Sequence, residues 1–301
     1  MHDRADRGCS RRIMDQTFLA ISHPVNDESG ISDMKDFSDI SSNCPVCGGS
    51  SRSVSFIAKV LHKYDVPYLY CNSCGLLQAE SPYWLDEAYQ SAIAFADTGL
   101  LDRNYRFVRR VAPLLYSLGM RDCRFLDFAG GYGVFTRLMR DVGFDFYWSD
   151  PYCANLVARG FERERVSPPF AAVTAFEVFE HVVDPLDFSR TVLSETGSST
   201  FIFSTLLFQD QPPAMDWWYY VFDTGQHISF YQARTLQVIA ESLGMYLYST
   251  PDLHMMSKRK MSDAGFRLIT GRLSKIYLAY VRRRMRSLTF SDHELILRGD
   301  G

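Results

Sequence analysis

Apolar positions along the middle of the chain follow two different periods. The helical period is clear over 103–119 and again over 231–244, where apolar residues recur every three or four positions. Short apolar runs of the kind that form buried strands lie at 124–128, 144–150, 171–178, 199–208 and 245–250. Strands that alternate with helices predict an α/β fold, in which helices cover both faces of a parallel sheet.

Two shorter helices are expected between these strands. Val134, Phe135, Leu138 and Met139 fall on one helical face, and Gly143 follows where a helix would end. Residues 153–161 predict a short helix and a turn. The whole pattern predicts a doubly wound, Rossmann-like, mostly parallel sheet.

The flanking segments differ from this core. Residues 1–40 are polar without a clear period, which predicts a disordered tail. Residues 41–80 contain two cysteine pairs and are expected to form a small domain of their own. We expect the α/β core to occupy 81–255 and a basic helical tail to occupy 256–301.

Composition favours a folded, globular protein and leaves its partner open. Of 301 residues, 47% are hydrophobic and 22% are charged, and the formal net charge of −3 gives no reason to expect nucleic acid. No apolar run is long enough to cross a membrane, and residues 1–16 lack the apolar centre of a signal peptide. We therefore expect the protein in the cytoplasm.

The charge is unevenly distributed, because 258–286 is strongly basic and has Asp263 as its one acid. Apolar residues recur with the helical period between Phe266 and Tyr280, which predicts a basic amphipathic helix. Such a helix could pack on the core and leave its basic face in water. Alternatively, it could lie on an anionic membrane surface or hold an anionic acceptor such as a nucleotide sugar.

Four of the seven cysteines form two pairs with the spacing of a metal site. Cys44 and Cys47 form one pair and Cys71 and Cys74 the other, and a glycine follows each pair directly. Thiolates three residues apart on a tight turn can face one ion, and two such turns complete a tetrahedral, structural Zn²⁺ site. A redox pair or free thiols are the alternatives. Few basic residues lie in this segment, so we expect no nucleic-acid contact here.

A glycine-rich turn follows the predicted strand that ends near Asp127. Ala129, Gly130, Gly131 and Gly133 let the backbone come close to a ligand, and Asp150 ends the next strand. In a doubly wound sheet, ligands bind at the carboxyl ends of the strands, and an acid in this position can bind ribose hydroxyls. The dinucleotide fingerprint GxGxxG is not met, because Thr136 occupies the place of its last glycine. A nicotinamide oxidoreductase is therefore the weaker interpretation.

The spacing of Asp127, Ala129, Gly131 and Gly133 resembles the first motif of class I S-adenosylmethionine-dependent methyltransferases. Ala129 stands where that family more often has glycine. The segment 175–185, "AFEVFEHVVDP", resembles the one after the fourth strand in bacterial small-molecule methyltransferases. The resemblance implies that Asp127, the glycine turn, Asp150 and Glu177 bind S-adenosylmethionine.

The chain departs from the family in one respect. Little chain separates Asp150 from the strand at Ala171, so the third strand of the family's sheet must be very short or missing. A zinc ribbon in front of such a core is similar to bacterial sugar methyltransferases, which implies a small-molecule acceptor such as a nucleotide sugar or glycan precursor. Those enzymes commonly have a further C-terminal domain. We expect this chain to be too short to contain one.

Three residues are candidates for moving a proton from the acceptor. Glu180 and His181 follow the fourth strand, and His227 lies on an aromatic-rich segment after the fifth. We favour His227 as the base, because its segment is the better candidate to face an acceptor. The alternative from another class is a non-catalytic binding protein, in which a zinc ribbon is joined to a degenerate cofactor fold.

Overall fold

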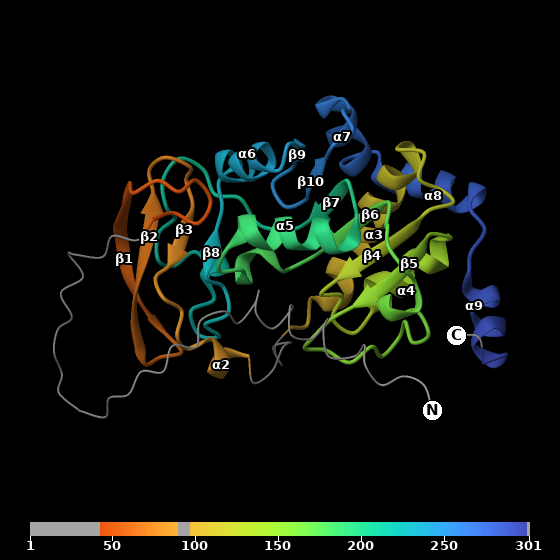
Figure 1. Cartoon of the computed structure of the whole chain (residues 1–301), viewed down its shortest axis with the longest axis horizontal. Coiled ribbons are helices and arrows are strands. Elements are labelled where there is room, and N and C mark those ends of the chain that lie inside the picture. The colour runs from red at the N-terminus through yellow and green to blue at the C-terminus, as the bar shows by residue number, and fades with distance from the viewer. Residues whose placement is uncertain (1–42, 90–96, 300–301) are drawn as a thin grey trace. The chain divides into compact units, whose positions relative to one another are not determined.

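The computed structural model describes residues 43–89 and 97–299, which form two compact units (Figure 1). The first unit takes residues 43–89, 180–188 and 206–239, and the second takes the remaining described residues. The predicted disordered tail, 1–40, lies outside the described residues. The units do not follow the domain boundaries expected from the sequence. Compact packing does not show which segments fold independently, so the boundaries at 41–80, 81–255 and 256–301 stay a prediction.

The first unit contains an antiparallel sheet of four strands in the order β1-β2-β3-β8. Its strands are β1 (Arg52–Val60), β2 (Tyr64–Cys71), β3 (Leu77–Ala79) and β8 (Ser229–Phe230). Leu61 and His62 both have positive φ, 51° and 60°, and turn the chain between β1 and β2 with the twist that hairpins favour. Aromatic side chains fill the core of this unit, among them Trp84, Tyr68, Tyr220 and Phe230.

The second unit contains a sheet of six strands in the order β5-β4-β6-β7-β10-β9. Its strands are β4 (Arg124–Phe128), β5 (Asp145–Ser149), β6 (Ala172–Ala175), β7 (Thr200–Phe203), β9 (Tyr246–Ser249) and β10 (His254–Ser257). The pairs from β5 to β7 are parallel, and β10 runs antiparallel to both of its neighbours. Since β5 and β6 lie on opposite sides of β4, the winding reverses at β4. The predicted mostly parallel, doubly wound fold is confirmed.

The short segment after β5 contains no strand of its own. Trp148, in β5, makes one isolated parallel bridge to Glu162. Within the described segment after β5, this bridge takes the place of the third strand of the family's sheet. The helix predicted at 153–161 is also missing, so that prediction was wrong. Asn155 Oδ1 instead accepts a hydrogen bond from Ala158 N at 2.9 Å, and Gly160 has φ of 92°. An asparagine that bonds to nearby backbone favours a turn over a helix.

Helices surround this sheet, and α3 packs against three of them, α4, α7 and α8. The helices with bounds in the described chain are α2 (Leu85–Ala88), α3 (Leu100–Ser117), α4 (Val134–Val142), α5 (Pro185–Thr196), α6 (Ala233–Ser242), α7 (Asp263–Thr270), α8 (Ser274–Arg284) and α9 (Thr289–Leu297). Single turns of 3₁₀ helix lie at η1 (Arg163–Arg165), η2 (Phe179–His181) and η3 (Trp218–Tyr220).

Between Phe266 and Tyr280, where the sequence predicted one helix, the chain forms parts of two, α7 and α8. Gly271 separates α7 from α8 because its φ and ψ, −101° and −123°, are not helical. A Cβ at this position would also lie 2.5 Å from Arg267 O. Helix α8 packs inside the second unit, to which it belongs, since Val281 is buried and Tyr277 contacts Tyr116.

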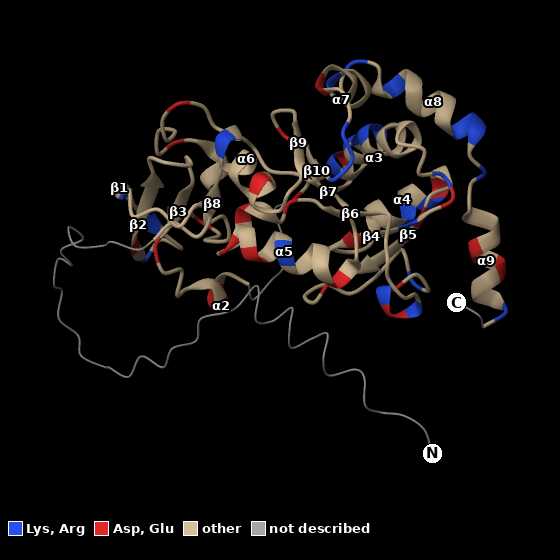
Figure 2. Cartoon of the chain, turned by 45° about the horizontal axis from the view of Figure 1, so that its top comes forward, with Lys and Arg blue, Asp and Glu red and all other residues tan. Residues whose placement is uncertain are grey.

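Basic residues lie at the two ends of α8 (Figure 2), and those residues, Lys275, Arg282, Arg283 and Arg284, are exposed. The observed packing agrees with the first interpretation of this segment, a helix on the core with a basic face in water. Contact of 258–286 with a membrane surface stays a prediction. Among the described residues, none of the helices is long and apolar enough to span a bilayer.

Candidate functional site

The glycine turn connects β4 to α4 and takes up left-handed backbone at three positions. Ala129, Gly131 and Gly133 have φ of 54°, 55° and 83°. A Cβ on Gly133 would lie 2.8 Å from Asn155 Oδ1, so glycine is needed there for space as well as for conformation. Ala129 bears the same conformation with a side chain, at a cost of about 1–2 kcal/mol. Strained backbone of this kind collects at ligand sites.

Asp127 lies at the end of β4 with its carboxylate buried. Thr136 Oγ1 donates to Oδ2 at 3.0 Å and Thr174 Oγ1 donates to Oδ1 at 2.8 Å, which ties β4 to α4 and to β6. Burial raises the pKa of Asp127 to about 7, against the two hydroxyl hydrogen bonds, which favour the ionised form. The Asp127 carboxylate therefore links the two elements that flank the glycine turn, β4 and α4, and joins them to β6.

Asp150 follows β5 directly and joins that strand to the glycine turn. Its Oδ2 accepts from Gly131 N at 2.8 Å, and its Oδ1 accepts from Tyr152 N and Cys153 N, each at 2.8 Å. Burial raises the pKa of the carboxyl, and the three backbone donors oppose that shift. The structure thus brings together the turn and the acid that the sequence paired.

Glu177 lies just after β6, the other neighbour of β4. Its φ is 55°, its N donates to Ser204 Oγ at 2.7 Å, and Ser204 Oγ donates to Glu177 Oε1 at 2.8 Å. The other oxygen, Oε2, lies 3.3 Å from Arg103 Nε. Burial is the main cause of a raised pKa for this carboxyl. The three acids therefore mark the carboxyl ends of three adjacent parallel strands.

Sequence reasoning missed the partners of these acids. Ser204 falls inside a predicted strand, and Thr136, Thr174 and Arg103 carry no motif that would single them out. The register of β4 with β6 brings Thr174 to Asp127, and that of β6 with β7 brings Ser204 to Glu177. Thr136 and Arg103, in contrast, come from helices α4 and α3.

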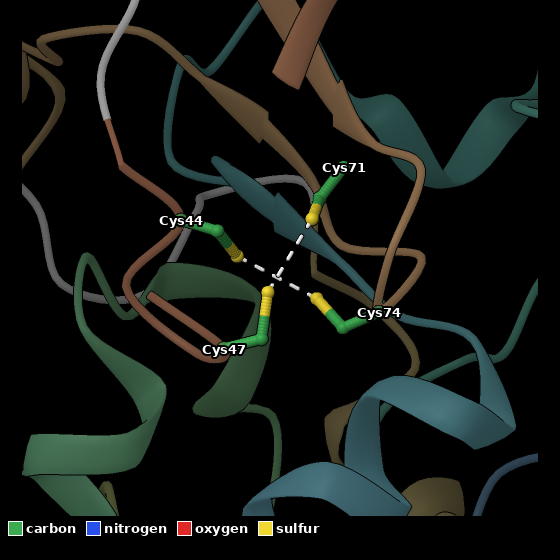
Figure 3. A group of neighbouring side chains, drawn as sticks. All are labelled: Cys44, Cys47, Cys71 and Cys74. Atoms are coloured by element: carbon green, nitrogen blue, oxygen red, sulfur yellow. Dashed lines mark hydrogen bonds between the residues drawn. The ribbon is translucent and has the colours of Figure 1, made fainter. Parts of the chain in front are cut away.

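The four paired cysteines lie together in the first unit, with their sulfur atoms directed at one point (Figure 3). Cys44 Sγ is 3.5 Å from Cys74 Sγ, Cys47 Sγ is 3.6 Å from Cys71 Sγ, and all four lie within 4.8 Å of one another. A zinc ion bonded to four thiolates at about 2.3 Å sets the sulfur atoms about 3.8 Å apart. The donor set and its dimensions therefore fit Zn²⁺.

The two cysteine turns have the same backbone hydrogen bonds. Gly48 N donates to Cys44 O and Gly75 N donates to Cys71 O, both at 2.8 Å. Both glycines have positive φ, 68° and 81°. Their surroundings differ, because a Cβ on Gly48 would meet nothing within 4 Å, whereas one on Gly75 would lie 2.2 Å from Gln232 Oε1.

Hydrogen bonding between the thiols shifts their acidity. The bond to Cys74 lowers the pKa of Cys44 to about 5, and the same bond raises the pKa of Cys74. One sulfur of the pair is therefore stabilised as a thiolate, the form that binds metals.

The three acid–base candidates also lie together in the first unit. One potential ligand atom from each of Glu180, His181 and His227 lies within 4.8 Å of the others. The two imidazole rings meet edge to face, with centroids 4.9 Å apart. His181 Nδ1 is 3.0 Å from Gln226 O, and His227 Nδ1 is 2.7 Å from Tyr219 O. Sequence reasoning named all three residues and could not foresee that they would adjoin.

Each histidine has a defined tautomer, because a carbonyl oxygen can only accept. Nδ1 must carry the proton in both rings, and the lone pair of each neutral ring is then on Nε2. The pKa of His181 is lowered to about 3, chiefly by burial and to a smaller extent by the neighbouring His227. Glu180 is fully buried beside these rings.

Comparison with protein families identifies the α/β part of the chain. The family model described as "Methyltransferase domain" matches residues 97–250, just over half of the chain. The chain belongs to this family. It is an S-adenosylmethionine-dependent methyltransferase, and the oxidoreductase and non-catalytic alternatives are set aside. No curated protein sequence matches it.

Three solved structures that are similar to this chain have low sequence identity to it. Magnesium protoporphyrin IX methyltransferase (ChlM) from Synechocystis PCC 6803 with bound SAH is 11% identical, over 57% of this chain and 90% of that chain, with a TM-score of 0.38. TnmH is 15% identical over 59% and 62%, with a TM-score of 0.42. An O-methyltransferase family protein from Burkholderia thailandensis is 14% identical over 60% and 68%, with a TM-score of 0.37.

Proposed function

We propose that this methyltransferase transfers the methyl group of S-adenosylmethionine to a small-molecule acceptor, and that the cofactor lies over the glycine turn. The observation that carries the proposal is the hydrogen bond from Gly131 N to Asp150 Oδ2, which fixes a strained, nearly side-chain-free loop beside an acid. A loop held in this way offers close backbone approach and a ribose partner at the same edge of the sheet.

The residues around the loop divide into two roles. Asp150 and the backbone of Ala129, Gly130, Gly131 and Gly133 would contact the cofactor. Asp127 would position the loop, since its oxygens are already bonded to two buried hydroxyls. Glu177 would be available at the end of β6, where Ser204 and Arg103 orient its carboxylate.

The proton leaves an acceptor hydroxyl or acidic carbon to the group formed by His227, His181 and Glu180. Bonds from Nδ1 to Tyr219 O and Gln226 O place the ring proton on Nδ1, so that Nε2 of each neutral ring can accept a proton, as a general base requires. We retain His227 as the preferred base, because it belongs to the aromatic segment after β7 that also supplies Tyr219. His181 and Glu180 are the alternatives.

The acceptor is a small molecule, with a nucleotide sugar or glycan precursor as the class we favour. Nucleic acid is the acceptor class that we do not expect, because basic residues in and beside the N-terminal sheet pair with acids. Lys59 lies 2.9 Å from Asp65 Oδ1, and Lys63 lies 2.6 Å from Glu87 Oε1. Paired charges give no continuous basic patch of the kind that binds nucleic acid.

One structural Zn²⁺ would be held by Cys44, Cys47, Cys71 and Cys74. With four protein ligands the site is closed, so the ion would organise the chain and take no part in methyl transfer.

Calorimetric titration tests the proposal on the full-length protein. S-adenosylmethionine should bind at one site per chain and NADH should not bind. His227→Ala should retain that affinity and lose roughly 10²–10⁴-fold in turnover once an acceptor is identified. His62 is an exposed histidine of the same unit. The variant His62→Ala is therefore the matched control and should keep full activity. Binding of NADH in place of S-adenosylmethionine would overturn the proposal.

A further inference from the structure

The chain contains a second group of side chains with the composition of a metal site. Glu180, His181 and His227 offer one carboxylate and two imidazoles, with ligand atoms within 4.8 Å of one another. All three belong to the first unit, as do the four cysteines. We propose that this group binds one divalent transition-metal ion, separate from the cysteine-bound Zn²⁺.

The first argument is the way in which the rings are held. Metal-binding histidines almost always donate their second N–H to a carbonyl or carboxylate, which fixes the tautomer and directs the other nitrogen at the ion. His181 donates to Gln226 O and His227 to Tyr219 O, at 3.0 and 2.7 Å. Both histidines therefore have the hydrogen bonding that a ligand needs.

The second argument is that the supporting backbone is fixed from several sides. Ile228 N donates to Glu180 O at 2.8 Å, so the segments that carry the three side chains are bonded to each other. Ser229 Oγ donates to Val182 O at 2.7 Å, and Gln78 Nε2 donates to Val183 O at 2.6 Å. This arrangement fastens the segment after His181 to β3 and β8 of the four-stranded sheet.

The third argument concerns the buried carboxylate. Glu180 is fully buried, and a carboxylate in such a place is stable as an anion when a cation or strong donors compensate its charge. The adjoining imidazoles are held as hydrogen-bond donors to carbonyls through Nδ1. A divalent ion bound by both Nε2 atoms and by Glu180 would place positive charge directly beside this buried carboxylate.

The donor set decides which ions are suited to the site. Imidazole nitrogen combined with one carboxylate suits Mn²⁺, Fe²⁺, Co²⁺, Ni²⁺ or Zn²⁺, whereas Mg²⁺ and Ca²⁺ prefer oxygen ligands throughout. Three protein ligands leave coordination positions open, in contrast to the closed cysteine site.

An open position could take an acceptor hydroxyl, an extension that rests on the proposed function. A bound cation would lower the pKa of a coordinated hydroxyl, and the proton would pass to water; with its Nε2 on the ion, His227 would then be a ligand in place of the base named above. The metal site can be tested without cofactor or acceptor, and its failure is therefore distinguishable from failure of the methyltransferase proposal.

Cobalt titration of the metal-free, full-length protein provides the test, with metal content and absorption measured together. Cobalt bound by thiolates absorbs strongly through sulfur-to-metal charge transfer, and cobalt bound by nitrogen and oxygen does not. We expect two Co²⁺ per chain, of which one adds no charge-transfer absorption. A single, thiolate-bound Co²⁺ in the wild-type protein would overturn the proposal.

Variants locate the second ion. His227→Ala and Glu180→Gln should each lose the second Co²⁺ and keep the thiolate absorption, which also reports that the first unit is folded. His62→Ala should keep both ions. Retention of the second Co²⁺ in folded His227→Ala would place it elsewhere and overturn the proposal, as would its displacement by millimolar Mg²⁺. If both variants fail to fold, the wild-type stoichiometry alone decides.

Discussion

The acids at the carboxyl ends of β4, β5 and β6 differ from the two histidines in how their hydrogen bonds are directed. Asp127, Asp150 and Glu177 accept bonds from hydroxyls, backbone N–H groups or arginine within the second unit. His181 and His227 each donate one bond from Nδ1 to a backbone carbonyl, which leaves the lone pair of the neutral ring on Nε2. The acids shape a loop, and the histidines present basic atoms.

This difference separates two kinds of mutational effect. Changes among the acids should alter stability and cofactor affinity, because these groups hold backbone in place. Changes among the histidines should alter proton transfer or metal binding and leave the cofactor loop intact. The unit that contains the histidines should also depend on the four cysteines, which belong to it.

The largest effect is expected from removal of the metal at the cysteine site. In the Cys44→Ser/Cys71→Ser double variant, the first unit should lose bound zinc and its cooperative unfolding. Structural zinc contributes about 10–16 kcal/mol in zinc-finger peptides, as much as the whole stability of a typical domain. Elemental analysis and thermal unfolding check this, with Cys123→Ser as the control. Undiminished zinc in the double variant would contradict the assignment.

The two cysteine turns should respond unequally to the same substitution. Gly48→Ala meets only the cost of left-handed backbone, about 1–2 kcal/mol. Gly75→Ala adds a clash with Gln232, so its total should reach roughly 2–5 kcal/mol. Denaturant unfolding of both variants measures the difference. Equal losses would show that Gln232 moves aside without cost.

Burial of Asp127 should make stability fall as pH rises. Its pKa increases from 3.8 to about 7 on folding, so the folded state favours the protonated form. The contribution is complete below about pH 4 and is lost as pH rises through 7, a change of roughly 2–4 kcal/mol. Asp127→Asn cannot titrate and should be flatter across this window. Parallel stability curves for wild type and variant would refute the pKa assignment.

Features encoded in contiguous residues could be predicted from the sequence. The glycine turn, Asp150 after the next strand and both cysteine pairs are local patterns, and five strands of the six-stranded sheet follow from the alternation of apolar periods, whereas β10 was not predicted. The missing third strand was also predictable, since too little chain lies between Asp150 and Ala171.

Features that depend on distant segments could not be predicted. His181 and His227 lie on separate stretches, and only the bonding of 226–228 to Glu180 and His181 brings their rings together. Ser204 meets Glu177 through the register of two strands. The basic tail was misjudged because its apolar period continues through Gly271, where the backbone leaves the helical conformation.

Cofactor affinity in two variants tests the division between the two regions most directly. Titration of S-adenosylmethionine into Asp150→Asn should show affinity at least about tenfold weaker, since a hydrogen bond to a charged acceptor contributes roughly 1.5–3 kcal/mol. Asp122→Asn removes an exposed charge before β4 and should leave affinity unchanged. His227→Ala should bind the cofactor as wild type does. Unchanged affinity in Asp150→Asn together with lost affinity in His227→Ala would contradict the account.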